Sequence, residues 1–468
     1  MKTKLFFLLL FCNFSFGLYA DYFDYNGLSY STSWYEGIDE TNAVAYCNGL
    51  AADNTDPESI VVPNTVVYHY SVWVNNTEIH KTKVLRVSSA SISGGEHTKS
   101  IIISDEIGGA SGLSGPSLES VYLGCKSFSS AFNSSPNLTH ITVGPNYKFH
   151  NNQTTCFYES TNLKELTWNA ISADQGDLGG GITYTAAVLQ NLETLTFGNE
   201  VQYIPPEIAN NAVKLNHVDI PASVTAIGRS AFINSGLTEI YIPNSVLSID
   251  YSVFKGCINL TSVVMDNSVT TLGTNVFNGC SSLKNVKLSE SLTSIPNQTF
   301  YHCYSLKTIV ISKNVSTIGN SAFSRCDSLE SVYLPDSLKT VESYAFSQCY
   351  SLAHVYSPIK EPQNVSFSPS NPFINSTCVV HVPKGTLALY QSLSPWNKYV
   401  LVDDYEQCVN TPGDVDCDGY VTSSDVTALY NYLLNGNTTY LSTGDVDGDG
   451  TITAADITAI YNYLLGNQ

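Results

Sequence analysis

The last 68 residues of the chain carry acidic side chains in a regular order. From 401 to 468 there are eleven Asp and Glu residues and no Lys or Arg. Carboxylates at alternate positions of a tight loop can direct oxygen atoms toward one hard cation, which prefers about six to eight oxygen ligands. Two segments 31 residues apart share one such pattern. The predicted ligands are Asp414, Asp416, Asp418, Tyr420, Thr422 and Asp425 in the first segment, and Asp445, Asp447, Asp449, Thr451, Thr453 and Asp456 in the second.

Both segments follow the oxygen-ligand spacing of an EF-hand-type calcium loop, with ligands at loop positions 1, 3, 5, 7, 9 and 12. Gly419 and Gly450 occupy position 6, where the loop turns sharply, and position 7 offers its backbone carbonyl. Position 12 is Asp, whose reach is shorter than that of the Glu of a full EF-hand. The alternative is a solvated acidic tail, but two copies in register favour two bound Ca²⁺ ions.

One helix is expected after each loop, over 426–434 and 457–465, because apolar residues recur there three and four apart. Asn435-Gly436 and Gly466 are typical of helix ends. A calcium loop followed only by its exiting helix, duplicated over 414–468, resembles a type I dockerin. The resemblance implies a small all-α module that binds a cohesin module. Such a partner usually stands on the scaffold protein of an extracellular polysaccharide-degrading assembly.

The helices depart from the common dockerin pattern. Tyr430-Asn431 and Tyr461-Asn462 stand where cellulosomal dockerins commonly carry a Lys-Arg pair. Loop positions 10 and 11, which often set the choice of cohesin in that family, are Ser423-Ser424 and Ala454-Ala455. These residues are the implied partner contacts, although a standard cohesin does not follow from them. The near-duplicate helices suggest two equivalent docking faces.

The middle of the chain repeats with a period of about 23 residues. Leucine columns and the pattern Leu-x-x-Val-x-Leu indicate a leucine-rich-repeat solenoid of eleven rungs, each with one strand and an irregular or short helical return. The two columns behind the strands hold Phe232, Phe254, Phe277, Phe300, Phe323 and Phe346, and Cys257, Cys280, Cys303, Cys326 and Cys349. The Phe and Cys columns are predicted to be interior ladders.

The cysteines allow two interpretations. Neighbouring rungs bring Cα atoms near the separation of a disulfide, but five cysteines in one column cannot all pair. Buried free thiols that pack as small hydrophobic groups are the favoured interpretation. For Cys408 and Cys417, outside the array, a local disulfide and unpaired thiols both remain open.

The segment 321–335, SAFSRCDSLESVYLP, resembles the BspA-like leucine-rich repeats of bacterial surface proteins. The likeness covers 111–402 and includes a closing cap around 378–385 and Trp396. The preceding segment, 21–110, resembles the β-rich N-terminal cap of the family. Residues 403–413 are expected to be a linker. The resemblance implies adhesion or binding without catalysis and does not identify the ligand. The alternative is a component of a polysaccharide-degrading complex that targets or weakly hydrolyses glycans.

The natural ligand surface of such an array is the exposed column of the strands. Tyr241, Tyr333 and Tyr356 lie in this column, and tyrosines can stack on sugars or on protein side chains. The simpler interpretation is that tyrosine is a good strand residue.

Composition limits the remaining possibilities. Residues 1–20 have a positive start, an apolar centre and Ala20 at a cleavage point, which predicts a secretory signal peptide and an extracellular or cell-surface location. The formal net charge of −20 disfavours nucleic acid, and no later stretch is long and apolar enough for membrane insertion. No Gly-x-Ser-x-Gly elbow, phosphate loop, His-Glu-x-x-His or Cys-x-x-Cys motif occurs, and no catalytic residue is predicted. Paired carboxylates for glycoside hydrolysis stay open, because their pairing is spatial.

Overall fold

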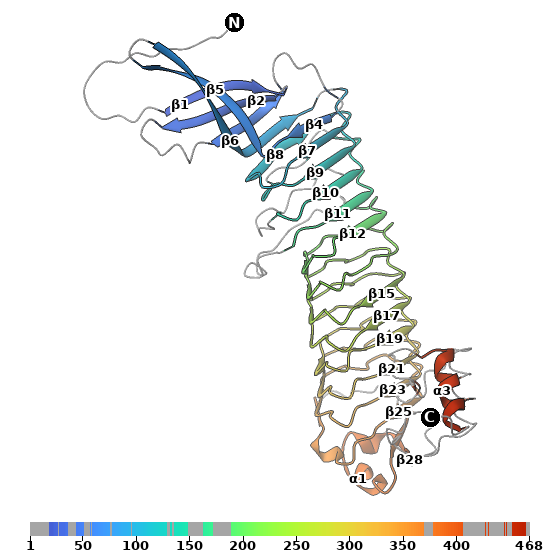
Figure 1. Ribbon diagram of the computed structural model, residues 1–468. Helices are drawn as coiled ribbons and strands as arrows, with labels where there is room; N and C mark the ends of the chain where they lie inside the picture. The colour runs from blue at the N-terminus through green and yellow to red at the C-terminus, as the bar shows by residue number, and fades with distance from the viewer. Residues whose placement is uncertain are drawn as a thin grey trace. The chain divides into compact units, whose positions relative to one another are not determined.

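The computed structural model describes residues 18–26, 28–35, 44–50, 57, 59–74, 77–94, 96–128, 132, 135–147, 162–171, 189–368, 378–405, 426, 429, 444, 446 and 452–464. The chain divides into two compact units, 1–203 and 204–468. Each unit contains parallel strands that stack one beside the next (Figure 1). The leucine-rich-repeat solenoid predicted from the sequence is therefore confirmed.

The first unit contains two sheets. In one sheet the order is β1 (Leu18–Tyr25), β2 (Leu28–Tyr35), β3 (Val44–Leu50), β6 (Thr77–Ser93) and β5 (Thr65–Val74), and β8 (Gly109–Ser114) also pairs with β6. The second sheet is ordered β4 (Ser59–Val62), β7 (Ser100–Ile103), β9 (Ser120–Leu123), β10 (His140–Val143), β11 (Glu165–Trp168) and β12 (Thr194–Phe197). All pairs of the second sheet are parallel. Two strands of this parallel stack, β4 and β7, thus precede residue 111.

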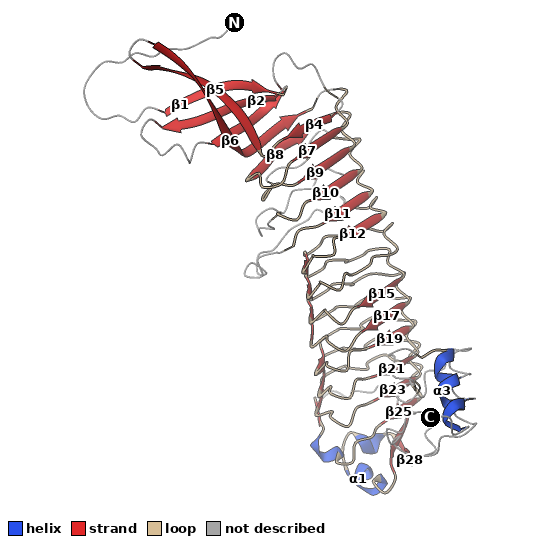
Figure 2. Cartoon of the chain, viewed as in Figure 1, coloured by secondary structure: helices blue, strands red, loops and turns tan. Residues whose placement is uncertain are grey.

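The second unit carries one strand column that continues rung by rung. Its members are β15 (Glu239–Ile242), β17 (Ser262–Met265), β19 (Asn285–Lys287), β21 (Thr308–Val310), β23 (Ser331–Tyr333), β25 (His354–Tyr356), β27 (Val379–Pro383) and β28 (Val400–Tyr405). A second column of two-residue strands comprises β14 (Ala226–Ile227), β16 (Ser248–Ile249), β18 (Thr271–Leu272), β20 (Ser294–Ile295), β22 (Thr317–Ile318), β24 (Thr340–Val341) and β26 (Ser366–Phe367). The strand β13 (Tyr203–Ile204) lies at the division between the units. Loops and turns make up most of each rung (Figure 2).

The Phe and Cys columns form the interior of the second unit. All six phenylalanines from Phe232 to Phe346 are fully buried, and consecutive rings stack with centroids 5.0–5.5 Å apart. The five cysteines are buried free thiols, as predicted. Each thiol donates a hydrogen bond to the Phe carbonyl of the preceding rung; for example, Cys326 Sγ lies 3.2 Å from Phe300 O. The thiols therefore join neighbouring rungs.

A short helical segment closes the array. Its elements are η3 (Pro362–Asn364), α1 (Leu387–Ser392) and η4 (Trp396–Lys398). Trp396 is 1% exposed and packs edge-on against Phe367 and Tyr390. The Tyr390 hydroxyl donates to Ile359 O at 2.8 Å. These side chains cover the apolar end that the last rung would otherwise expose.

Candidate functional site

The predicted strand-face residues occupy the same register position in different rungs. Tyr241 lies on β15 beside Val264 of β17, and Tyr333 lies on β23 beside Tyr356 of β25. Their strands alternate buried and more exposed residues, because one face of each strand packs on the core. The structure thus places all three tyrosines on the outer face of the strand column.

Tyr333 and Tyr356 stack on one another. Their ring centroids are 4.4 Å apart with planes 7° from parallel, and His381 continues the stack 4.5 Å from Tyr356. The Tyr356 ring lies between the rings of Tyr333 and His381, so both of its faces are occupied. This part of the strand face presents ring edges and hydroxyl groups to a ligand.

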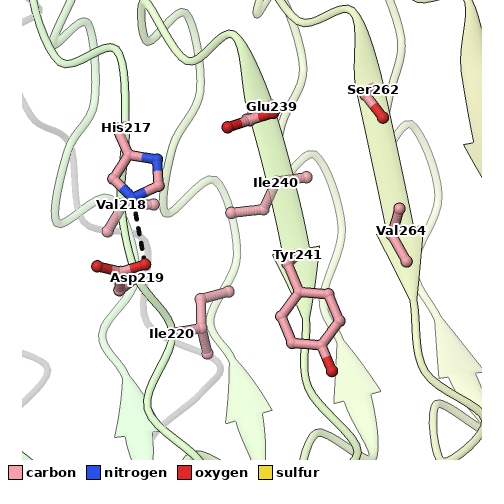
Figure 3. A pocket seen from close by; sticks show the side chains of 9 residues that line it. All are labelled: His217, Val218, Asp219, Ile220, Glu239, Ile240, Tyr241, Ser262 and Val264. Atoms are coloured by element: carbon pink, nitrogen blue, oxygen red, sulfur yellow. Dashed lines mark hydrogen bonds and ion pairs between the residues drawn. The ribbon is translucent and has the colours of Figure 1, made fainter. Parts of the chain in front are cut away.

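Tyr241 has a different environment. Its side chain is 55% exposed, and its hydroxyl donates to Asp266 Oδ2 at 2.6 Å, which raises the pKa of Tyr241. It borders a shallow hollow of about 280 Å³ that also touches Glu239 and an ion pair between His217 and Asp219, 3.1 Å apart (Figure 3). The neighbouring lining residues Asp219 and Val264 are not aromatic, unlike the neighbours of Tyr356 (Figure 3).

Next to the stacked tyrosines lies a chain of hydrogen-bonded histidines that the sequence analysis missed. His381 Nδ1 donates to Asp404 Oδ1 at 2.7 Å, and His381 Nε2 lies within hydrogen-bond distance of His354 Nδ1, at 3.0 Å. The two histidines lie on adjacent strands, two register positions apart and thus on the same face. Their separation of 27 residues combines a rung of 25 residues, from His354 to its register partner Val379, with two further positions along β27.

In the C-terminal module, the described part of the second loop is organised by Asp456. Asp456 is fully buried, and its two carboxylate oxygens accept hydrogen bonds from Val446 N and Thr453 N, both at 2.7 Å. Ala455 N donates to Thr453 Oγ1 at 3.0 Å. This reciprocal capping starts α3 (Ala454–Leu464) and ties the beginning of the loop to the helix.

A small apolar cluster supports that arrangement. Val426, Leu429 and Ile460 are buried together, with Val446 and Ile452 packed against them. Gly444 lies against this cluster, since a Cβ at Gly444 would lie 3.0 Å from Ile452 Cδ1. The cluster joins residues of both predicted helices.

Several predicted site residues lie outside the residues, or the side chains, that the structure describes. Among the predicted ligands only Thr453 and Asp456 are described, and among the partner-contact residues of this module only Ala454 and Ala455 are described with their side chains. Those outside are Asp414, Asp416, Asp418, Tyr420, Thr422, Asp425, Asp445, Asp447, Asp449, Thr451, Ser423, Ser424, Tyr430, Asn431 and the side chains of Tyr461 and Asn462, as are Cys408 and Cys417.

The described residues of the second loop fit a calcium module. A buried carboxylate at the last loop position, held by backbone N–H groups, is a hard oxygen donor fixed in place. Among the described residues as a whole, no three His, Cys, Asp or Glu side chains gather as metal ligands would, and most of the predicted calcium ligands lie outside them. No described helix has the length and apolar character needed to cross a bilayer.

The stacked rungs define the class of this molecule, a leucine-rich-repeat solenoid. The family model for the BspA type leucine rich repeat region matches in six copies, over residues 117–174, 185–261 and 247–378. These matches span more than half of the chain, which therefore belongs to this family. A dockerin type I domain matches residues 412–465, and domains of this type bind calcium and imply a cohesin partner.

Solved structures with a similar arrangement come from bacterial leucine-rich-repeat proteins. A leucine-rich repeat protein from Bacteroides ovatus is 19% identical, with a TM-score of 0.43, over 81% of this chain and 100% of that one. A leucine rich cell surface protein from Faecalibacterium prausnitzii is 21% identical, with a TM-score of 0.33, over 75% and 98%. No curated protein sequence matches the chain.

Proposed function

We propose that this protein is a non-catalytic binding protein of the cell surface or the extracellular space. Its solenoid presents a ligand-binding surface, and its dockerin attaches it to a cohesin-type partner. The observation that carries this proposal is the combination of a BspA-type array with a dockerin type I domain in one chain. Proteins built from these two modules typically bind other molecules and do not catalyse reactions.

The dockerin is proposed to hold two Ca²⁺ ions, one in each loop. The ions would be held by the six predicted oxygen ligands from Asp414 to Asp425 and by the six from Asp445 to Asp456. Bound calcium would neutralise the clustered carboxylates and fix each loop against its helix. Asp456 supports this assignment, because its carboxylate is already oriented by Val446 N and Thr453 N.

The proposed partner surface combines loop positions 10 and 11 with the helix positions that carry Tyr-Asn. Because both repeats carry Tyr-Asn where a Lys-Arg pair is common, the matching cohesin should offer an apolar, hydrogen-bonding surface in place of an acidic one. Tyr430 and Tyr461 would supply the main apolar contacts there.

A capture experiment tests the attachment. The full chain is immobilised and exposed to extracellular proteins of the source organism, with calcium or with a chelator. A cohesin-type protein is expected only with calcium, and the variant Asp416→Ala/Asp447→Ala should lose it. Calcium binding by the chain without capture of any partner would contradict the proposed attachment.

The solenoid ligand is tested separately with the same full chain. Binding to immobilised host matrix proteins, bacterial cells and glycans is compared between the wild type and Tyr241→Ser, which removes the open ring of the strand face. Loss of binding in the variant supports the strand face as the ligand surface. If the wild type binds none of these surfaces, the proposed binding function is wrong.

A second candidate function places the chain in an extracellular polysaccharide-degrading complex, either targeting it or weakly hydrolysing glycans. The dockerin favours this candidate, since it implies attachment of the cellulosome type. Release of reducing sugar from a glycan panel separates the two: hydrolysis by the purified chain would favour the second candidate.

The domain boundaries and the signal peptide stay predictions. We propose cleavage after Ala20, a β-rich cap over 21–110, the repeat array over 111–402, a linker over 403–413 and the dockerin over 414–468. N-terminal sequencing of the secreted protein tests the first of these, and a start at Met1 would contradict it.

A further inference from the structure

One turn of each rung in the second unit has a left-handed backbone. Asn211 and Asn234, and after them Gly256 and Gly279, have φ between 55° and 78°, a conformation that Asn and Gly adopt readily. In the next three rungs the same position is occupied by His302, Arg325 and Gln348, with φ of 62°, 62° and 61°. Long side chains here add backbone strain, as they do at the other left-handed position of the rungs, for example at Gln298 and Tyr344.

The side chains at this turn carry polar atoms that are buried without a hydrogen-bond partner among the described residues. These atoms are His302 Nε2, Arg325 Nε, Asp327 Oδ1 and Gln348 Oε1. The backbone bonds His302 N to Ser324 O and Arg325 N to Ser347 O show that three consecutive rungs supply them. Buried polar groups without partners are rare, and the four residues that carry these atoms are themselves only partly buried. An external ligand can therefore contact these polar residues, although not the four buried atoms themselves.

Two exposed tyrosines flank this polar group. Tyr304 and Tyr350 lie one rung to either side of Asp327, and their side chains are 37% and 62% exposed. The His302 ring stacks on Tyr304, with centroids 5.3 Å apart, and thereby supports it. Two rung steps amount to roughly 10 Å, which is comparable to the length of a disaccharide in an extended glycan.

The charges of this turn cancel. Arg325 and Asp327 have opposite charges, and burial together with Arg325 lowers the pKa of His302, which leaves its ring neutral at neutral pH. The turn offers a donor at Arg325 and oxygen acceptors at Asp327 and Gln348. A neutral ligand rich in hydroxyl groups satisfies donors and acceptors together, whereas a charged ligand meets no net attraction.

From this geometry we infer that the turn edge formed by His302, Tyr304, Arg325, Asp327, Gln348 and Tyr350 binds an extended neutral glycan. Tyr304 and Tyr350 stack on sugar rings two units apart, and the partly exposed polar side chains of Arg325, Asp327 and Gln348 between them bind the hydroxyl groups of the intervening sugar. This turn edge is separate from the strand-face tyrosines. The inference rests on the proposed function, in which the solenoid binds an external ligand, and it names the class of that ligand.

Native gel electrophoresis of the full chain in gels containing hydroxyethylcellulose, arabinoxylan or galactomannan tests the inference, with polygalacturonate as the anionic comparison. At least one neutral glycan should retard the wild type. Tyr304→Ser should weaken this binding about tenfold, because one stacked ring is lost. Serine is a matched replacement, since Ser281 occupies the equivalent position one rung earlier.

A second variant separates a binding role from a structural one. Arg325→Gly introduces the residue that Gly256 and Gly279 supply in earlier rungs and removes the strain at a positive φ. It should keep or raise the thermal transition while weakening glycan binding. Tyr251→Ser, at an exposed tyrosine outside both the turn edge and the strand-face tyrosines, is the control and should leave glycan binding unchanged.

The outcomes distinguish this inference from the proposed function. Loss of glycan binding in Tyr304→Ser and Arg325→Gly, but not in Tyr251→Ser, supports the turn edge. Loss only in Tyr241→Ser overturns the turn edge and leaves a strand-face binding protein. Binding to proteins or cells without retardation by any neutral glycan overturns the glycan inference alone. Failure of the wild type to bind any of these surfaces overturns both.

Discussion

The solenoid and the C-terminal module of this protein are held together in different ways. In the solenoid, Phe277, Phe300 and Phe323 are fully buried and stack on the rungs before and after them. In the C-terminal module, the described apolar cluster is small and a buried carboxylate, Asp456, ties the loop to the helix. A rung can rely on its neighbours for apolar burial, whereas a module of this size needs polar closure and a cation. This comparison predicts that the two regions respond to different perturbations.

Alkaline pH should have the largest effect, and it should act on the solenoid. Burial raises the pKa of Cys257 to about 11 and also raises the pKa values of Cys280, Cys303 and Cys326. The folded chain therefore keeps these protons to higher pH than the unfolded chain, in which a thiol ionises near about pH 8.5. The contribution of each buried thiol to the free energy of unfolding is therefore complete below about pH 8.5 and is lost as the pH rises through the pKa of the folded state. Over that range each thiol loses about 1.4 kcal/mol for every pH unit.

Urea unfolding at pH 8 and pH 10, followed by circular dichroism, checks this prediction. The urea concentration at half unfolding should be markedly lower at pH 10 than at pH 8. In Cys326→Ser this decrease should be smaller by the contribution of one thiol. Equal midpoints at the two pH values would show that the thiols do not contribute in this way.

Truncation of one stacked ring should have the next largest effect. Phe300→Ala leaves a cavity between Phe277 and Phe323 and should lower the free energy of unfolding by about 3–5 kcal/mol. Phe300→Leu is the matched control and should cost less, because it fills more of the space. Calorimetric calcium titration of both variants should give the wild-type affinity. A large loss of calcium binding would show that the solenoid and the C-terminal module are not independent.

Substitution of Asp456 should affect only the C-terminal module. Asp456→Ala leaves Val446 N and Thr453 N without their acceptor, which should cost about 1–3 kcal/mol of local stability. We expect weaker calcium binding by calorimetry and faster amide exchange in α3, while the solenoid transition stays unchanged. Asp456→Asn keeps the shape but removes the charge and replaces one of the two acceptor oxygens by an NH2 group, so its effect should lie between those of the wild type and Asp456→Ala. Wild-type calcium affinity in both variants would show that Asp456 is not part of the proposed calcium site.

The smallest effect is expected for the bond between a thiol and the preceding rung. Cys326→Ala removes the donor to Phe300 O, whereas Cys326→Ser keeps an O–H donor at the same place. At neutral pH the alanine variant should therefore be less stable than the serine variant by about 1 kcal/mol. Thermal unfolding measures the difference, and a more stable alanine variant would mean that Cys326 acts only through packing.

Much of the architecture could be predicted because each rung repeats the same burial pattern. The Phe and Cys columns, the parallel strands and the free thiols follow from a period of about 23 residues that aligns equivalent side chains. The duplicated Asp-x-Asp-x-Asp-Gly pattern indicated calcium loops for a similar reason, since ligand spacing along the chain sets the geometry of a short loop. Both are local or strictly periodic signals.

The surface features could not be predicted in this way. Tyr241, Tyr333 and Tyr356 share one column, yet Tyr333 and Tyr356 stack while Tyr241 stands beside Asp219 and Val264. Which neighbour a side chain meets depends on the rungs before and after it.

The sequence by itself determined the repeat, its interior columns and the calcium-type loops, because these depend on residue spacing within one rung or one loop. Only the tertiary structure decided that His354, His381 and Asp404 join in one hydrogen-bonded chain. It also decided that His302, Arg325 and Gln348 gather unpartnered polar atoms at one left-handed turn. The physical reason is that stacking brings together residues 23 or more positions apart, and burial then determines which of their polar atoms can reach a partner.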